Sequence, residues 1–98
     1  MDKTEIITRL RAQQDTLQKA GVEHLAIFGS RARGDHRPDS DLDVLLDVDW
    51  DRKFSLVDLV GVERLIGEAV DAPVSAIMRR SIKPDFMARI APDVTDVF

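Results

Sequence analysis

The stretch that decides the fold is Phe28–Asp49, which reads FGSRARGDHRPDSDLDVLLDVD. It begins at the end of one apolar run, crosses a Gly-Ser step and a polar segment, and enters a second apolar run behind two aspartates. In that second run, DLDVLLDV, leucine and valine alternate with aspartate, which is the two-residue period of a strand. One face of this strand is therefore expected to be buried, while the other carries Asp41, Asp43 and Asp47.

Apolar spacing predicts the elements on either side of this stretch. A helix is expected over residues 4–20, begun by Asp2 or Thr4 and ended at Gly21. The remaining expected elements are a strand at 24–28, a short helix at 30–33, a helix at 55–70 capped by Ser55, a strand at 73–78 and a last helix at 83–91. This order predicts an α/β fold with a small mixed sheet of three to four strands flanked by helices.

Length and composition limit the classes of protein that the chain can represent. Its 98 residues predict one domain, 1–98, and 44% hydrophobic with 33% charged residues is typical of a globular protein. The net charge of -4 argues against direct nucleic-acid binding, and the absence of cysteine excludes disulfides and thiolate metal sites. There is no apolar stretch long enough to span a membrane and no signal-peptide pattern at the N-terminus, so a cytoplasmic location is expected.

The two aspartates at the head of the second apolar run suggest a metal site. Asp41 and Asp43 lie two residues apart on one strand face, with α-carbons roughly 6.5 Å apart, a span that can hold one or two hard cations. Magnesium binds through one or two carboxylates together with substrate phosphates, which predicts a nucleotide triphosphate as its partner. Gly29 and Ser30 fit that partner, because glycine lets backbone amides approach phosphate oxygens and the hydroxyl adds a donor.

The spacing of these residues resembles the nucleotidyltransferase superfamily of DNA polymerase beta type. Its signature is Gly-Ser, ten residues, then Asp-x-Asp, and here GS, RARGDHRPDS and DLD reproduce it. More narrowly, the chain resembles the minimal nucleotidyltransferases, which pair with HEPN-domain toxins in toxin–antitoxin systems. The resemblance implies the nucleotidyltransferase fold and transfer of AMP from ATP to a hydroxyl of the toxin. It also implies catalytic and Mg²⁺-binding roles for Asp41 and Asp43 and nucleotide-binding roles for Gly29, Ser30, Arg31 and Arg33.

The chain departs from the family pattern at one position. The family takes a third carboxylate from the neighbouring strand, usually within Val-Asp-Leu-Val, and that segment aligned with PVSAIM places Ser75 where the acid should be. Serine is a weaker metal ligand and no base at neutral pH, so its presence is expected to weaken catalysis more than nucleotide binding. Asp71 has the same strand parity but lies four residues earlier, and only a bend near Pro73 would bring it to the site.

Two functional hypotheses follow from this pattern. The first is an adenylyltransferase antitoxin acting on a HEPN-type toxin, and the second is a degenerate nucleotide-binding module that neutralises its partner by contact alone. A transferase acting on a small molecule is less consistent with so short a chain, which has no second domain to form an acceptor pocket.

Several other residues admit a purely structural interpretation. Gly29 and Ser30 could form a simple turn, and Asp41 with Asp43 could be solvated charges on an edge strand. Trp50 and Phe54 fit either a satellite core or a partner contact, and Arg79 with Arg80 either a surface pair or a phosphate or partner contact.

Overall fold

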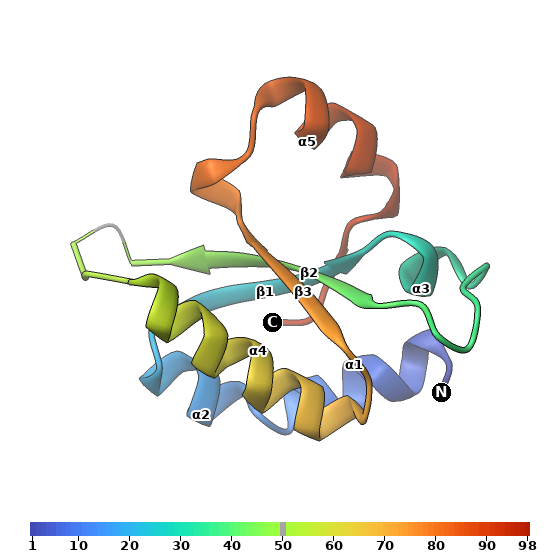
Figure 1. Ribbon diagram of the computed structural model, residues 1–98, viewed down its shortest axis with the longest axis horizontal. Helices are drawn as coiled ribbons and strands as arrows, with labels where there is room; N and C mark the ends of the chain where they lie inside the picture. Colours follow the sequence, from blue (N-terminus) through green and yellow to red (C-terminus); the bar gives the residue numbers. More distant parts are fainter. Residues whose placement is uncertain (50) are drawn as a thin grey trace.

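A four-stranded mixed sheet forms the centre of the protein, seen in a computed structural model that describes residues 1–49 and 51–98 (Figure 1). The strand order is β3-β2-β1-β4, with β1 antiparallel to both β2 and β4 and with β2 parallel to β3. The strands are β1 Val22–Phe28, β2 Leu42–Val48, β3 Val74–Met78 and β4 Thr95–Asp96. This confirms the predicted α/β class and mixed sheet. Of the three to four strands expected, the sheet has four.

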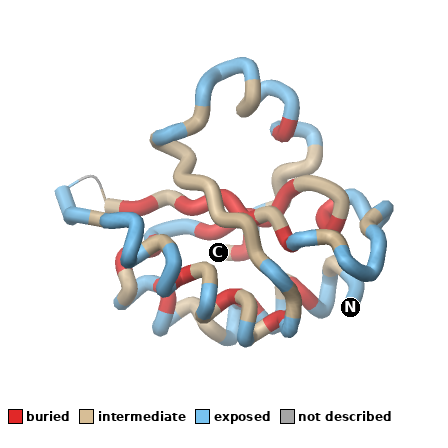
Figure 2. Tube along the Cα trace, viewed as in Figure 1, coloured by how far each residue is buried: buried red, intermediate tan, exposed pale blue. Residues whose placement is uncertain are grey.

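Helices cover both faces of the sheet. On one side lie α1 (Lys3–Arg11), α2 (Gln14–Lys19) and α4 (Leu56–Val70). On the other lies α5 (Pro84–Ile90), between the one-turn 3-10 helices η1 (Arg79–Ser81) and η2 (Ala91–Asp93) (Figure 1). The short α3 (Ser30–Arg33) follows β1 at one end of the sheet. The buried residues concentrate along the strands and the inner sides of the helices (Figure 2).

The first expected helix, residues 4–20, is divided in two. Its predicted start is confirmed, since the Asp2 carboxylate accepts the backbone N–H of Glu5. The chain then leaves α1 at Ala12, and the N–H of Gln13 bonds the carbonyl of Leu10 in a tighter, three-residue turn before α2 begins. Apolar spacing does not mark this break, because Ile6, Leu10 and Leu17 are buried in the same core cluster on both sides of it.

The face of β2 that carries the aspartates is covered at its middle, which the alternation of the sequence did not indicate. Leu45 points to that face and is fully buried in a cluster with Ala26, Phe28 and Ile90. Phe86 of α5 packs edge-on against Phe28, with ring centroids 6.3 Å apart. The side chains of Asp43 and Asp47 therefore lie on either side of a dry centre.

Helix α4 begins with a reciprocal cap and supports the edge of the sheet. Ser55 and Asp58 bond each other's backbone N–H groups, as the sequence predicted for Ser55. Further along, a carboxylate oxygen of Glu63 accepts the N–H of Ala76 on edge strand β3 at 3.0 Å.

Of the two aromatic residues that the sequence assigned to a satellite core or a partner contact, one is described, and it belongs to the main core instead. Phe54 packs against the main cluster, while Trp50 lies outside the described residues. In the described part of the chain, no helix is both long and apolar enough to span a membrane.

Candidate nucleotide site

The Gly-Ser turn lies directly against one of the two aspartates. Gly29 follows β1 with φ 76° and ψ -158°, a conformation that is essentially restricted to glycine. A Cβ added here would overlap the Oδ2 atom of Asp43, whose residue pairs with Phe28 across β1 and β2. The Gly-Ser step and the second aspartate are therefore in contact, and glycine is required by that contact.

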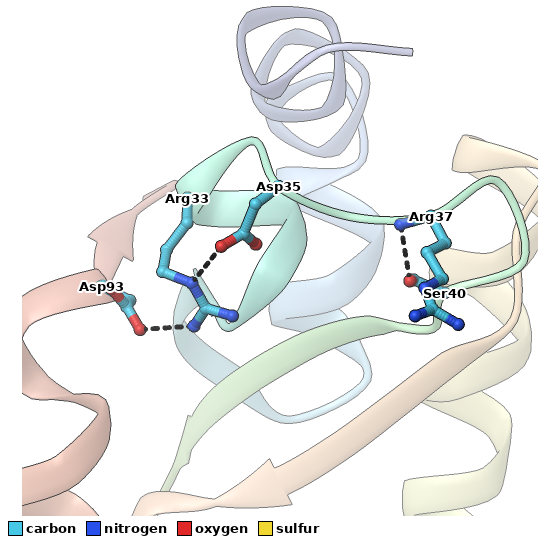
Figure 3. Close-up of polar contacts among 5 residues, drawn as sticks. All are labelled: Arg33, Asp35, Arg37, Ser40 and Asp93. Atoms are coloured by element: carbon cyan, nitrogen blue, oxygen red, sulfur yellow. Dashed lines mark hydrogen bonds and ion pairs between the residues drawn. The ribbon is translucent and has the colours of Figure 1, made fainter.

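The ten residues between the Gly-Ser step and Asp41 form a closed loop. Arg31 is 7% exposed, and its Nε and Nη2 donate to the carbonyls of Ser40 and Pro38 at 2.9 and 3.4 Å. The backbone N–H of Arg37 donates to the Ser40 hydroxyl at 2.9 Å (Figure 3). Arg31 thus points inward and holds the loop that presents Asp41, which was not anticipated from the sequence.

Asp41 and Asp43 are close enough to influence each other. Asp41 is exposed just before β2, and Asp43 is half-buried as the second residue of the strand. Burial raises the pKa of Asp43, the negative charge of Asp41 raises it further, and the nearby Arg33 opposes both effects. A hard cation would relieve this repulsion, so the two carboxylates fit Mg²⁺.

Among the described residues, these two carboxylates are the candidate metal ligands of the site. Across residues 1–49 and 51–98 there is no cluster of three or more His, Cys, Asp or Glu side chains suited to a metal. Oxygen ligands beyond the pair would come from substrate phosphates and water.

Arg33 is the cation nearest to this pair, and acidic side chains hold it from two sides. Its Nε donates to Asp35 at 3.1 Å and its Nη1 to Asp93 at 2.8 Å (Figure 3). Both hydrogen bonds raise the pKa of Arg33. Asp93 belongs to η2, 60 residues further along the chain, and nothing in its local sequence indicates this contact.

Ser75 occupies the predicted place beside the acid pair. In the parallel pairing of β2 with β3, Ser75 is the partner of Asp43, so both side chains project from the same face. Asp71 is not brought there. It ends α4 in a left-handed conformation, φ 52°, and lines a separate 340 Å³ cavity with Arg9, Arg31 and neighbouring residues. The Asp41 and Asp43 pair therefore has serine, not a third carboxylate, on the adjacent strand.

Comparison with known proteins gives the family. The sequence profile of the nucleotidyltransferase domain matches residues 7–93. The chain belongs to the nucleotidyltransferase domain family. This nucleotidyltransferase domain is 30% identical to the protein adenylyltransferase MntA of Thermococcus cleftensis over 94 residues, covering 95% of this chain and 93% of that one.

Solved structures of other nucleotidyltransferases share its fold. A candidate minimal nucleotidyltransferase is 25% identical with a TM-score of 0.79, covering 97% of this chain and 95% of that one. A second structure, described as a tri-AMPylated HEPN toxin of Shewanella oneidensis in complex with its MNT antitoxin, matches with a TM-score of 0.59. It is 12% identical, covering 90% of this chain and 71% of that one, so it supports the fold alone.

Proposed function

We propose that this nucleotidyltransferase domain is a Mg²⁺-dependent protein adenylyltransferase that moves AMP from ATP to a hydroxyl of a HEPN-type toxin and acts as its antitoxin. The observation that carries the proposal is the contact of the Gly29 turn with the Asp43 carboxylate, beside Asp41. A glycine turn with exposed backbone and two mutually repelling carboxylates meet at one end of the sheet, an arrangement that suits a metal–triphosphate complex.

Each residue of the site has a part in this reaction. Asp41 and Asp43 would hold Mg²⁺, which would neutralise charge on the phosphates. The Gly29 and Ser30 backbone and hydroxyl orient the triphosphate, and Arg33 adds positive charge beside them. The acceptor hydroxyl oxygen forms a bond to the α-phosphorus, the bond from that phosphorus to the bridging oxygen breaks, and pyrophosphate leaves.

The acceptor proton is the weak point of this mechanism. It must pass to a base, and the strand position beside Asp43 offers the neutral hydroxyl of Ser75. This observation favours a second candidate function, a nucleotide-binding module that neutralises its toxin by contact with little or no transfer.

Calorimetry with ATP, with and without Mg²⁺, tests the nucleotide binding that both candidate functions require. We expect Mg²⁺-dependent binding by the wild type and its loss in the Asp41→Asn, Asp43→Asn double variant, because the amides cannot compensate the metal charge. Asp47→Asn is the matched control, since Asp47 shares the strand face of Asp43 but is paired with Arg79. Equal affinity in the wild type and the double variant would refute the site.

Transfer itself separates the two candidates. Wild-type protein is incubated with ATP labelled at the α-phosphate, Mg²⁺ and a candidate HEPN-type partner protein. Label on the partner identifies the enzyme, whereas tight complex formation without label identifies the binding module.

A further inference from the structure

A cationic groove lies at the end of the sheet opposite the nucleotide site. It has a volume of about 370 Å³ and is lined by Arg52, Lys53, Phe54, Ser55 and Arg80. Among the described residues its lining contains three cations and no carboxylate, although Asp58, which bonds Ser55 and feels the charge of Arg52, lies beside it. The chain as a whole carries a net charge of -4. A groove of this composition favours an anionic occupant.

An exposed apolar strip continues directly from this groove. Leu56, Val57 and Val60, in the first turns of α4, are 76%, 80% and 58% exposed. These turns lie at one end of the sheet and α3 lies at the other (Figure 1), and the outer surface of α4 is exposed (Figure 2). Large apolar side chains that are this exposed and contiguous mark an interaction surface.

The groove and the strip together occupy a surface separate from the nucleotide site. Asp43 is five residues from the end of β2 at Val48, roughly 16 Å at about 3.3 Å per residue. The groove residues follow the ends of β2 and β3. An occupant that also reaches the nucleotide site must therefore be a macromolecule.

We propose that this surface, the groove lined by Arg52, Lys53 and Arg80 with the strip Leu56, Val57 and Val60, docks the protein that the nucleotide site modifies, through a face that carries carboxylates beside apolar side chains. The inference rests on the proposed function, because it names where that partner binds.

Two other occupants fit the surface less well. A nucleic acid would find cations in the groove but would cover three aliphatic side chains with phosphate and sugar. A twofold dimer would use the same patch on both copies, and a patch whose lining has no carboxylate would bring no acidic partner to the cations of the groove. An acidic and apolar protein face satisfies both halves of the surface.

The test measures binding of a candidate HEPN-type partner protein by interferometry without nucleotide. Val57→Asp and Lys53→Glu are each expected to weaken binding at least tenfold. Val57 lies in the first turn of α4, where an added carboxylate suits the helix dipole, so this variant should fold. Lys83→Glu is the matched charge-reversal control, because Lys83 is exposed and precedes α5 on the other side of the sheet.

Steady-state transfer adds a second readout. If transfer occurs, Val57→Asp should raise KM for the partner while kcat and ATP affinity stay at wild-type values. Unchanged partner affinity and KM in both variants would overturn the docking surface and leave the proposed function intact. Binding that both variants weaken, without any label transfer, would support the surface and contradict the enzyme.

The rival occupants are assayed in parallel. A wild-type dimer in sedimentation that Val57→Asp dissociates would overturn the proposal in favour of a second copy. Binding of a single-stranded RNA that Lys53→Glu abolishes, with partner binding unchanged, would overturn it in favour of nucleic acid. A wild type that does not bind the partner at all would overturn both this proposal and the proposed function.

Discussion

Asp43 and Asp47 occupy the same face of the same strand, yet their surroundings are opposite. Asp47 accepts a hydrogen bond from Nε of Arg79 at 2.9 Å, so its charge is paired within the chain. Asp43 is half-buried beside Asp41, and the cation that reaches it, Arg33, is shared with two other carboxylates. Leu45 separates the two aspartates under the cover of α5.

The difference shows that two aspartates on one strand face can have separate roles. The carboxylate of Asp47 is paired within the fold, whereas Asp43 carries a repulsion from Asp41 that a bound cation would relieve. Carboxylates held in this way cost stability and are typical of binding sites. Three experiments can break or sharpen this contrast.

The largest effect is expected from Ser75→Asp, which adds a third carboxylate beside Asp43. If Ser75 limits transfer, the variant should modify the partner about 10² to 10⁴ times faster, the contribution typical of a positioned base. Transfer of label from ATP to the partner measures it. Strong wild-type transfer that the variant does not change would contradict this role, and Asp71→Asn would then show whether Asp71 supplies the carboxylate.

An intermediate effect is expected from Gly29→Ala, compared with Gly34→Ala. Both glycines have positive φ, 76° and 85°, so each alanine should cost about 1 to 3 kcal/mol of backbone strain. At Gly29 the new Cβ also overlaps the Asp43 carboxylate, while at Gly34 it meets open space. Only Gly29→Ala should therefore lose Mg²⁺-dependent ATP binding, as measured by calorimetry alongside urea unfolding.

That pair of variants has a clear negative outcome. Equal losses of stability with ATP binding retained in both would mean that the close approach of Asp43 to the turn has no role in binding nucleotide.

The smallest effects are expected on stability in the absence of Mg²⁺, from replacing either aspartate by asparagine. The two replacements should change stability in opposite directions. Folding raises the pKa of Asp43, so its ionised form destabilises the fold, and Asp43→Asn should raise the melting temperature near neutral pH. This gain should shrink as the pH falls through that raised pKa, and it should vanish only below the ordinary pKa of an aspartate in the unfolded chain, where both states hold the proton. Asp47→Asn should instead cost up to about 1 kcal/mol, since its ion pair is partly exposed.

Thermal melts of both variants from about pH 4 to pH 8 provide the measurement. Destabilisation by Asp43→Asn near neutral pH would mean that Asp43 is already compensated in the fold, and the contrast between the two ends of β2 would fail.

The sequence predicted features that depend on local pattern. Alternation in DLDVLLDV gave the core-facing side of β2, and Ser55 began its helix as expected. Ser75 lies beside Asp43, where the alignment with the family's strand segment placed it. The short helix at 30–33 also formed where the Gly-Ser step indicated.

Features that depend on tertiary contact could not be predicted in this way. The Arg31 side chain points inward because it donates to backbone carbonyls of a loop, and that loop has no periodic pattern in the sequence. Asp93 is brought to Arg33 by the packing of α5 over Leu45, which joins segments far apart in the chain. Strand β4 has two residues, too few to show alternation. The charges of the site were visible in the sequence, but the groups that position them were not.

The bond from Ala76 N–H to Glu63 bears on how the protein behaves at high concentration. A sheet with free edges can recruit strands from other molecules and aggregate. Here one edge is β4, with only two residues to offer, and the other is β3, where a carboxylate occupies an outward N–H and brings negative charge to the edge. Glu63 thus takes up a backbone donor of β3 that a strand from another molecule would need, and β4 is too short to pair with more than a few residues of such a strand.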